Sequence, residues 1–559
     1  MSKKLIQKIA AVIVVAVMVL GSFMMYGGSS NVPQIMGMEG SAEAIRIDPN
    51  APTAGVRGPF VETFAAAVSM DTDLRNLPQT GPERKHLSRE MGQMPARVKD
   101  QGPDTVVQTD SAVGNRPLGE PLAAAPAPLI TFKGLDLQNW GAGWPPDTHG
   151  DVGPTHYIQA VNTSIGIFRK SDGVRLAAFT FDNFFIAAGG SGACTTINYG
   201  DPVVLYDQIS GRWIITDFAF AGDGTTPPYY ECVAVSKTAD PVSGGWWLYE
   251  IVASTTALND YPKLGIWNDG IYMSANMFTG GASYGGVKVW ALNRDDLISG
   301  APLRSVSFTL GTSYFSLLPS NLKGTLAPAG TPNYFLSDYG SNTSVKMWKF
   351  TTNWATPSSS TFTGPTSIAV ASFTRPASNS VRQNGSTVRL DTLGDRLMSN
   401  LQYRNVNGVQ SLWVSRTAKV SNSSYGIRWY EIRNMSGTPS VYQQGTYAPN
   451  AAYRWMPSLA VDKFGNMAVG YSVSTSTMFP AIRYAGRLVT DALGTLGQTE
   501  QTLFAGTGGQ TSYSRWGDYA SMSVDPVDDC TFWFTTEYYE TTGTNWQTRI
   551  GSFKFPGCP

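Results

Sequence analysis

Charged residues are scarce in this chain of 559 residues: they make up 15% of it, and 41 Lys and Arg balance 41 Asp and Glu. A chain without excess positive charge lacks the electrostatic attraction through which proteins bind nucleic acid, so we expect no nucleic-acid partner. Cysteine is rare too. Its four copies form no C-x-x-C pair, which argues against a thiolate metal site or a redox motif.

Several common patterns are also missing. Beyond the N-terminus, no stretch of useful length has the 3.6-residue periodicity of an amphipathic helix, which argues against a helical protein. The G-x-S-x-G, H-E-x-x-H, phosphate-loop and EF-hand patterns are absent, so no catalytic motif can be assigned. Glycine (58 residues) and aromatic residues (12%) are abundant instead, and this composition favours an all-β, turn-rich protein.

The first 28 residues have the make-up of a secretory signal. Three lysines precede an apolar run from Ile9 to Leu20, and a basic flank before a short apolar core is typical of a signal peptide. With Phe23–Tyr26 the run is near the minimum length of a membrane-spanning helix. Residues 1–28 are therefore either a signal peptide or a signal anchor. In both cases we expect the rest of the chain to be secreted, periplasmic or anchored at the cell surface, with membrane contact only through this segment.

An even number of cysteines in an exported protein indicates disulfides. Proximity along the chain favours the pairs Cys194–Cys232 and Cys530–Cys558. Each would close a loop of about 30–40 residues and stabilise the fold by about 3–4 kcal/mol in the chain-entropy model. The alternative is four buried free thiols.

Residues 29–128 lack sustained periodicity and are rich in proline, alanine, glycine and polar residues, as in Pro117–Pro128. Only Phe60–Met70 is compatible with a short helix. We therefore expect a low-complexity linker or pro-segment, mostly disordered, that acts as an N-terminal stalk for a folded head.

From Leu129 onward a strand–turn–strand unit recurs. In one copy, the apolar stretch Val203–Tyr206 is followed by the turn Asp207–Gly211 and a second strand, Arg212–Phe220. Seven such units, spaced roughly 60 residues apart with about four short strands each, predict a β-propeller. Residues 129–559 are therefore expected to form an all-β, seven-bladed β-propeller of four-stranded blades, as a monomeric head, with the strand at Leu129–Phe132 completing the last blade.

Acidic residues stand at the start of several units. The unit starts are Asp151, Asp201, Asp260, Pro319, Asp395, Pro457 and Asp518. Residues just before the innermost strand of a blade lie on one face of a propeller near its axis, so these carboxylates are expected to converge. Like charges at close range cannot all ionise freely. The ring must hold a cation such as Ca²⁺, pair with arginine, or contain a carboxyl group of raised pKa.

Any two of Asp201, Asp260, Asp395 and Asp518 are candidates for the acid and base of glycoside hydrolysis. The candidate ligand-binding residues beside the unit starts are Arg396, Arg454, Trp455, Arg515 and Trp516, because aromatic faces stack on sugar rings and arginine binds acidic sugars. The competing interpretation is structural, since Asp, Gly and Pro before a strand are ordinary turn residues.

His149 and His156 lie seven residues apart in the segment that leads into the first unit. Together with Asp147 or Asp151 they form a candidate metal site. His149 is also a candidate ligand-binding residue, or the base of a lyase. The competing interpretation is a histidine that loop contacts hold in place.

Three features resemble known families. Gly200–Val204, followed by a turn and Trp213–Ile214, resembles the first inner strand of five-bladed arabinanase- and xylosidase-type glycosidases, which implies a catalytic base at Asp201. The recurring Asp/Gly turn before an aromatic residue is loosely similar to the Asp-box repeats of sialidase-like propellers. Residues 144–168 and Arg515–Tyr538 look similar to a group of largely uncharacterised bacterial secreted propellers, which implies export and the fold but no reaction.

Three functions remain open at this point. The first is a non-catalytic, exported propeller that binds a glycan or a cell-surface protein through its axial face. The second is a glycoside hydrolase or polysaccharide lyase whose axial Asp and Arg residues act on the sugar. The third is a structural propeller that Ca²⁺ stabilises.

Overall fold

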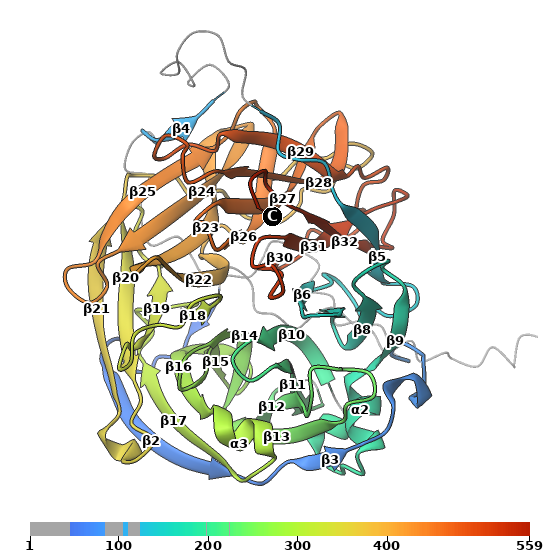
Figure 1. Ribbon diagram of the computed structural model, residues 1–559, viewed down its shortest axis with the longest axis vertical. Helices are drawn as coiled ribbons and strands as arrows, with labels where there is room; N and C mark the ends of the chain where they lie inside the picture. Colours follow the sequence, from blue (N-terminus) through green and yellow to red (C-terminus); the bar gives the residue numbers. More distant parts are fainter. Residues whose placement is uncertain (1–44, 84–103, 110–122, 197, 223, 559) are drawn as a thin grey trace, which may run out of the picture. The chain divides into compact units, whose positions relative to one another are not determined.

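Strands make up most of the regular structure. The computed structural model describes residues 45–83, 104–109, 123–196, 198–222 and 224–558, which belong to one compact unit, Glu43–Pro559. Within this unit, antiparallel sheets surround a common centre, so the fold is an all-β propeller (Figure 1). The predicted signal peptide or anchor, residues 1–28, lies outside the described residues. In the part of the chain that the structure describes, no helix is long and apolar enough to span a membrane.

Five of the sheets are each built on one meander of four antiparallel strands. Their strands, from the centre outward, are β6 (His149–Val152), β7 (His156–Val161), β8 (Ser164–Arg169) and β9 (Arg175–Thr180); β10 (Asn198–Asp207), β11 (Arg212–Ala221), β12 (Thr226–Ser236) and β13 (Trp246–Ser254); β14 (Ala257–Ile266), β15 (Gly270–Thr279), β16 (Ser283–Asn293) and β17 (Leu303–Leu310); β26 (Tyr453–Val461), β27 (Met467–Thr475), β28 (Met478–Arg487) and β29 (Gln498–Phe504); β30 (Ser521–Val524), β31 (Phe532–Tyr538), β32 (Gln547–Phe553) and β5 (Ile130–Asp136).

The sixth sheet has nine strands, because two four-stranded meanders pair with each other and β4 (Val107–Gln108) adds to the edge of the second. Their strands are β18 (Leu318–Leu322), β19 (Asn333–Ser337), β20 (Ser344–Thr351) and β21 (Thr361–Ala369); β22 (Met398–Val406), β23 (Val409–Ser421), β24 (Ser424–Arg433) and β25 (Ser440–Tyr447). The innermost strands β18 and β22 are parallel, with Asn321 opposite Gln402. Short helical segments lie in the connections: α2 (Phe181–Ala187), α3 (Arg294–Ser299), η1 (Leu74–Asn76), η2 (Ala193–Thr195) and η3 (Pro357–Ser359).

The strands are apolar on both faces because each sheet packs between two others. In β11, Ile214 belongs to the same buried cluster as Leu264 of β14, whereas the next residue, Ile215, packs with Ile165 of β8. The last meander is closed by the N-terminal strand: β5 pairs with β32, with Phe132 opposite Ile550. This confirms the predicted role of the strand that begins near Leu129.

Side chains of the innermost strands reach the backbone of the next innermost strand around the axis. On β10, Val204 N–H donates to His149 Nδ1 of β6 at 3.2 Å. On β14, Tyr261 N–H donates to Asp201 Oδ2 of β10 at 2.8 Å. Polar side chains thus join strands that do not pair directly.

The same kind of contact continues on the other side of the axis. Ile266 N–H of β14 donates to Asn321 Oδ1 of β18 at 3.2 Å, and β18 pairs with β22 through the backbone. The Gln402 amide of β22 then makes two hydrogen bonds with Val461 of β26, accepting from its N–H at 2.6 Å and donating to its C=O at 3.1 Å.

Two further hydrogen bonds close the ring. Met522 N–H of β30 donates to Ser458 Oγ of β26 at 3.0 Å, and Ser521 Oγ of β30 donates to Gly150 O of β6 at 2.7 Å. Every innermost strand is therefore hydrogen-bonded to both neighbouring innermost strands. We call this closed set of hydrogen bonds the ring, and the polar residues named above form it.

We expect Gln402→Ala to lower the free energy of unfolding by about 3 kcal/mol. The change leaves both backbone groups of Val461 buried without a partner, at a cost of about 1–3 kcal/mol each. Urea unfolding measures the effect, with Gln501→Ala in outer strand β29 as the matched control. Equal urea midpoints for the two variants would contradict the conclusion that these hydrogen bonds stabilise the fold.

Each innermost strand has a residue with left-handed backbone, which lies either within the first half of the strand or up to five residues before it. These non-glycine residues have φ between 42° and 57°, and they are Asp147, Asp201, Tyr261, Ser316, Leu393, Met456 and Asp518. For a residue with a Cβ atom this conformation costs about 1–3 kcal/mol. What recurs from one innermost strand to the next is therefore the left-handed backbone conformation. Only some of the residues that adopt it are acidic.

The predicted equivalence of the acidic unit starts is therefore wrong. Asp201 and Asp518 hold the left-handed position, but Asp260 precedes it because Tyr261 takes that place. Asp395 follows the left-handed residue of its meander, and Asp151 lies inside β6. The sequence hides this register because tyrosine, leucine and methionine are not residues from which positive φ is expected.

We expect Ser316→Gly to raise the free energy of unfolding by about 1 kcal/mol. Ser316 is buried at φ 49°, and its hydroxyl has no hydrogen-bond partner among the described residues. Glycine relieves the backbone strain and removes the unsatisfied group, which outweighs its larger loss of backbone entropy. Thermal melting tests this, and a Tm below that of the wild type would contradict it.

The described part of residues 29–128 is not a disordered stalk. β1 (Arg46–Ile47), β2 (Val56–Phe64), β3 (Val68–Met70) and β4 (Val107–Gln108) pair with β16, β17, β13 and β25, respectively, and Figure 1 shows β2 and β3 along the outer edge. The sequence of Phe60–Met70 is compatible with a short helix, but the structure forms the end of β2 and β3 there. Phe60 and Val61 are 45% and 49% exposed. This outermost strand has no buried face, so its sequence shows no alternating pattern that would predict a strand.

Candidate functional site

The predicted axial residues gather at the end of the axis where the innermost strands begin, which we call the start face. Tyr261 lies among them: its hydroxyl donates to Asp518 O at 3.4 Å, and the Arg396 guanidinium lies 4.5 Å from the centre of its ring. The Lys263 ammonium lies 3.4 Å from the same ring and 4.0 Å from that of Tyr519. The structure thus brings Asp518 and Arg396 together around aromatic rings and a lysine that the sequence analysis did not single out.

The candidate carboxylates are bonded within the protein. Asp201 accepts the backbone N–H of β14 described above, and Asp518 forms an ion pair with Arg515. Asp395 Oδ1 accepts from Arg396 Nε at 2.8 Å. Asp201 and Asp518 have no exposed surface and Asp395 is 7% exposed. These contacts fix strands and charges, and they hold all three carboxylates where little or no solvent reaches them.

Asp260 is 1% exposed and lies opposite Asn276 of β15. Its own position in the strand differs from that of Asp201, as the left-handed residue shows. The structure therefore places the four candidate carboxylates near one end of the axis but in different roles.

The segment 370–397, between β21 and β22, covers the start face. Its residues Val381, Leu390 and Leu393 are at most 2% exposed and share a buried cluster with Tyr261 and Trp516. Residues of three separated meanders therefore pack under one irregular segment. Among the described residues, this segment therefore covers the end of the axis at which these meanders begin.

Hydrogen bonds fasten the far side of this covering segment. Asp391 N–H donates to Ser514 O at 2.8 Å. The side-chain amide of Gln383 bonds the backbone of Gln510 twice. Gln383 Nε2 donates to Gln510 O at 2.9 Å, and Gln510 N–H donates to Gln383 Oε1 at 2.8 Å. The segment therefore reaches the residues that precede β30.

Two arginines and one aspartate fasten its near side. Asp338, which has no exposed surface, pairs with Arg416 and lies 3.4 Å from Arg375 Nη2. Both guanidinium groups donate to Gly394 O and lie over the ring of Phe373. Burial and the nearby Arg375 lower the pKa of Arg416 to about 10, so the cation is kept because Asp338 faces it.

His149 is 1% exposed and accepts the Val204 N–H on Nδ1. Burial, with the charges of Lys263 and Lys323, lowers the pKa of His149 to about 3, so the imidazole stays neutral at physiological pH. His156 lies at the other end of the β6–β7 hairpin, where Thr155 Oγ1 is 2.9 Å from its Nδ1. The predicted metal site that joined the two histidines is therefore wrong.

The acids proposed for that metal site are engaged elsewhere. Asp151 pairs with Lys323 at 2.7 Å and accepts the Tyr206 N–H at 2.8 Å. Asp147 is buried at the left-handed position. Among the residues that the structure describes, no group of three or more His, Cys, Asp or Glu side chains is arranged to hold a metal ion.

The remaining candidate ligand-binding residues lie inside the protein. Arg454 pairs with Glu500 at 2.7 Å and its side chain has no exposed surface. Trp455 and Trp516 are fully buried, with ring centroids 5.6 Å apart, and Trp516 Nε1 donates to Ser472 Oγ at 3.1 Å. Of the predicted set only Arg515, with 24% of its side chain exposed, reaches solvent.

Three buried acids escaped the sequence analysis. Burial raises the pKa of Glu231 to about 8, and it raises the pKa values of Asp217 and Glu537 well above their usual range. Glu231 Oε2 accepts from Asn259 Nδ2 at 2.9 Å. A single acid inside an apolar strand, as in Tyr229–Val235, is the signal that could have revealed Glu231.

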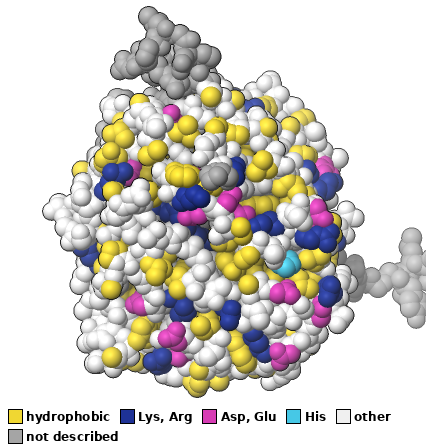
Figure 2. Space-filling view, in the orientation of Figure 1, with side chains coloured by type: hydrophobic (Ala, Val, Ile, Leu, Met, Phe, Trp, Pro, Cys, Tyr) yellow, Lys and Arg dark blue, Asp and Glu magenta, His cyan; other side chains and the backbone are white. Residues whose placement is uncertain are grey.

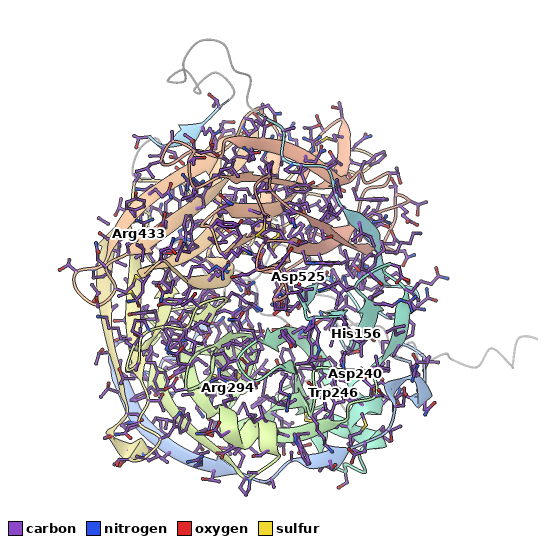
Figure 3. The ribbon with its side chains drawn as sticks, in the orientation of Figure 1. His156, Asp240, Trp246, Arg294, Arg433 and Asp525 are labelled. Atoms are coloured by element: carbon purple, nitrogen blue, oxygen red, sulfur yellow. A yellow bond between two sulfur atoms is a disulfide. The ribbon has the colours of Figure 1, made fainter. Side chains whose placement is uncertain are left out.

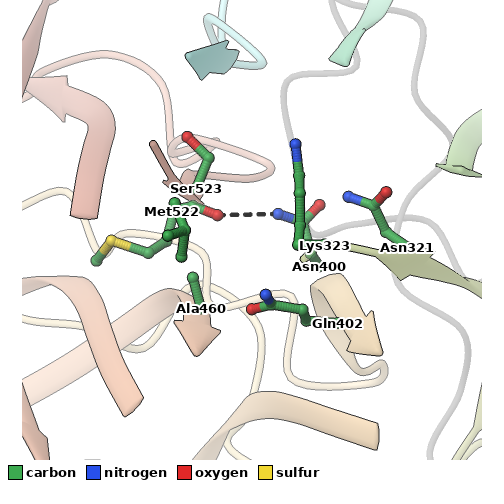
Figure 4. A pocket seen from close by; sticks show the side chains of 8 residues that line it. Asn321, Lys323, Asn400, Gln402, Ala460, Met522 and Ser523 are labelled. Atoms are coloured by element: carbon green, nitrogen blue, oxygen red, sulfur yellow. Dashed lines mark hydrogen bonds between the residues drawn. The ribbon is translucent and has the colours of Figure 1, made fainter. Parts of the chain in front are cut away.

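A small cavity lies at the opposite end of the axis, between β18, β22, β26 and β30 (Figure 4). Its volume is about 10 Å³, which accommodates about one water molecule and no sugar ring. Asn400 Nδ2, one of the groups that line it, donates to Met522 O at 3.0 Å.

Charged side chains where the innermost strands end are paired. Arg294 Nε lies 2.8 Å from Asp207 Oδ2, and Lys170 Nζ lies 2.9 Å from Asp525 Oδ2. Figure 3 places Arg294 beside α3 and Asp525 near the centre of the view. On the face drawn in Figure 2, charges of both signs are interspersed, so no field of one sign marks a binding surface there.

The predicted disulfides are confirmed. Cys194 is joined to Cys232, with Cα atoms 5.8 Å apart, and Cys530 to Cys558, with Cα atoms 6.2 Å apart. The first ties η2 to β12, and the second fastens the C-terminal segment to the start of β31. Disulfides of this kind fit an extracellular protein.

Comparison with known proteins yields neither a matching family model nor a matching curated protein. Among solved structures, the chain is similar to an exo-β-1,3-galactanase from Clostridium thermocellum (9% identity, 60% of this chain and 77% of that one, TM-score 0.29). It is also similar to an α-L-arabinofuranosidase from Lactobacillus brevis (10%, 64% and 91%, TM-score 0.27) and to Drosophila Semaphorin 1b (9%, 77% and 87%, TM-score 0.37). All three TM-scores are below 0.5 and all three identities are at most 10%, so the likeness carries no argument about activity.

Proposed function

We propose that this protein is an exported, seven-bladed β-propeller that binds a glycan without cleaving it, on or near a cell surface. Each meander described above is one blade, and the two meanders of the nine-stranded sheet count separately. Two disulfides support export. The head acts as a monomer and has no nucleic-acid partner, in line with its balanced charge.

One observation carries the non-catalytic part of this proposal: the start face is filled. Hydrolysis of a glycosidic bond needs two carboxyl groups about 5–10 Å apart that border a space for the sugar. Here Asp201 accepts a backbone N–H, and Asp395 and Asp518 each bind an arginine. Segment 370–397 packs over them.

Co-sedimentation of the full chain with a panel of insoluble polysaccharides tests the proposal, with soluble reducing sugar measured in the same tubes. The expected result is retention of the protein on at least one polysaccharide with no release of sugar above a boiled control. Retention on none of them would contradict the binding function, and steady release of sugar would show that the protein is a hydrolase or lyase instead.

A further inference from the structure

The covering segment carries two arginines whose side chains face solvent side by side. Val381 and Leu390 pair across a hairpin, each donating its N–H to the other's carbonyl at 3.1 and 3.0 Å. Both side chains are buried, whereas the next residues outward, Arg382 and Arg389, are exposed. This is a single bridge, and the antiparallel register continued one residue beyond it brings Arg382 and Arg389 to facing positions of the two chain segments.

These two cations are uncompensated. Neither guanidinium has an ion-pair or hydrogen-bond partner in the described part of the chain, and the acids of the same segment, Asp391 and Asp395, are buried. Like charges at opposed positions destabilise a pair of strands. Their neighbours Arg375 and Arg416, by contrast, are held by Asp338.

Half-buried aromatic rings flank the hairpin on both sides. At its turn, the ring of Phe479 packs so closely on Gly385 that a Cβ atom there would lie 2.7 Å from Phe479 Cε1. On its other side, next to Ser514, the ring of Tyr513 is stacked on that of Trp144 with centroids 4.3 Å apart. Aromatic rings at the border of solvent offer an apolar face to a sugar ring.

We propose that Arg382 and Arg389 clamp the acidic groups of an anionic polysaccharide whose sugar rings pack on Tyr513 and Phe479. A guanidinium presents two parallel N–H groups that match a carboxylate or a sulfate, and two guanidiniums at neighbouring cross-strand positions engage acidic groups on successive sugars. This inference rests on the proposed glycan-binding function and names its ligand class and its site.

Binding of the full chain to polygalacturonate tests the proposal, with fully methyl-esterified polygalacturonate as the uncharged form of the same polymer. We expect binding to the acidic polymer at low salt, at least about 10-fold weaker binding to the ester, and weakening as salt rises. Inorganic polyphosphate, a polyanion without sugar rings, is the third probe, and we expect it to bind at least about 10-fold more weakly than polygalacturonate.

The variants are Arg382→Gln, Arg389→Gln and the double change, with Arg57→Gln on β2 as a matched control because Arg57 is also exposed. Each single change is expected to weaken binding to polygalacturonate about 10-fold, and the double change to abolish it. Arg57→Gln is expected to bind like the wild type. All variants should melt within about 1 °C of the wild type, since surface changes have small effects.

The outcomes separate the clamp from the proposed function. A double variant that binds polygalacturonate like the wild type, or a wild type that binds the methyl ester or polyphosphate equally well, would overturn the clamp. It would leave the broader glycan-binding function standing if another polysaccharide retains the protein. A wild type that binds no polysaccharide at all would overturn both.

Discussion

Replacing Asp338 with alanine is expected to lower the free energy of unfolding by about 4 kcal/mol. Asp338 faces Arg416 and Arg375; neither Asp338 nor Arg416 has exposed surface, and the side chain of Arg375 is 11% exposed. Breaking a buried ion pair from one side costs about 3–5 kcal/mol because the charge left behind has neither water nor a counter-ion. Here two guanidinium groups lose the one carboxylate that pairs with them among the described residues, and we expect an effect near the middle of that range.

The loss should be local as well as global. Both arginines hold Gly394 O and lie over Phe373, so without Asp338 the near side of segment 370–397 is expected to loosen. Urea unfolding gives the global effect, and limited proteolysis gives the local one as faster cleavage within this segment.

Asp172→Ala, which breaks the exposed Arg169–Asp172 pair, is the matched control and should leave the urea midpoint unchanged. Asp338→Asn, which keeps the shape of the side chain, should fall between the wild type and the alanine variant. Asp338→Ala with the midpoint and cleavage rate of the wild type would contradict the role assigned to this ion pair.

Glu231→Gln is expected to change how stability depends on pH. The folded-state pKa of Glu231 is about 8, well above the usual 4.5, because of burial first and the nearby Asp201 charge second. A folded pKa above the unfolded one means that the contribution of this group is fully present below pH 4.5 and is lost as pH rises toward 8. The slope is about 1.4 kcal/mol per pH unit.

His149 acts in the opposite direction on the acid side. Its folded pKa of about 3 lies below the usual 6.5, so its contribution is present above pH 6.5 and is lost as the pH falls. Between pH 6.5 and 8, the free energies of unfolding of the wild type and Glu231→Gln therefore differ in their pH dependence because of the titration of Glu231. Relative to the wild type, the variant should therefore gain about 2 kcal/mol over that interval.

Urea unfolding at pH 6.5 and at pH 8 measures this difference. Glu537, whose pKa is also raised, titrates in both proteins and cancels in the comparison. The pKa of Asp217 is raised by burial and in part by the charge of Glu231, so it falls in the variant and acts in the same direction as the loss of Glu231. Glu62→Gln on the outer strand β2, where the side chain is 44% exposed, should run parallel to the wild type. Parallel curves for Glu231→Gln as well would show that Glu231 does not hold a proton in the folded protein.

The propeller could be predicted from the sequence because its inner strands leave a clear trace. Strands such as Val203–Tyr206 and Arg212–Phe220 are apolar on both faces, which happens when a sheet is packed between two others. The disulfides could be predicted too, since each cysteine pair is closer in sequence than any alternative and both pairs formed.

Other features left no trace that a pattern search can detect. β2 has no buried face, so Val56–Phe64 shows no alternation. The feature that recurs near the beginning of each innermost strand is a residue with positive φ, and Tyr261 and Met456 take this conformation as well as Asp201. The acidic residues therefore did not mark equivalent positions. Segment 370–397 buries Val381, Leu390 and Leu393 at irregular spacing, so no periodic pattern identifies it as part of the core.

The axial site was predicted in its position but not in its role. The sequence analysis placed Asp201, Asp518, Arg396 and Arg515 near one end of the axis, and the structure brings them there. The sequence could not reveal that each of these charged side chains bonds to another group of the protein. That depends on distances of a few ångströms between residues far apart in the sequence.

The most direct test of the central claim, that the axial carboxylates hold the fold together and do no chemistry, is a turnover assay with Asp201→Asn and Asp518→Asn. Release of reducing sugar is measured from every polysaccharide that retains the wild type. We expect no release by the wild type or by either variant, retention of all three proteins, and a lower Tm for both variants. Sugar release by the wild type that either variant abolishes, at an unchanged Tm, would contradict the claim.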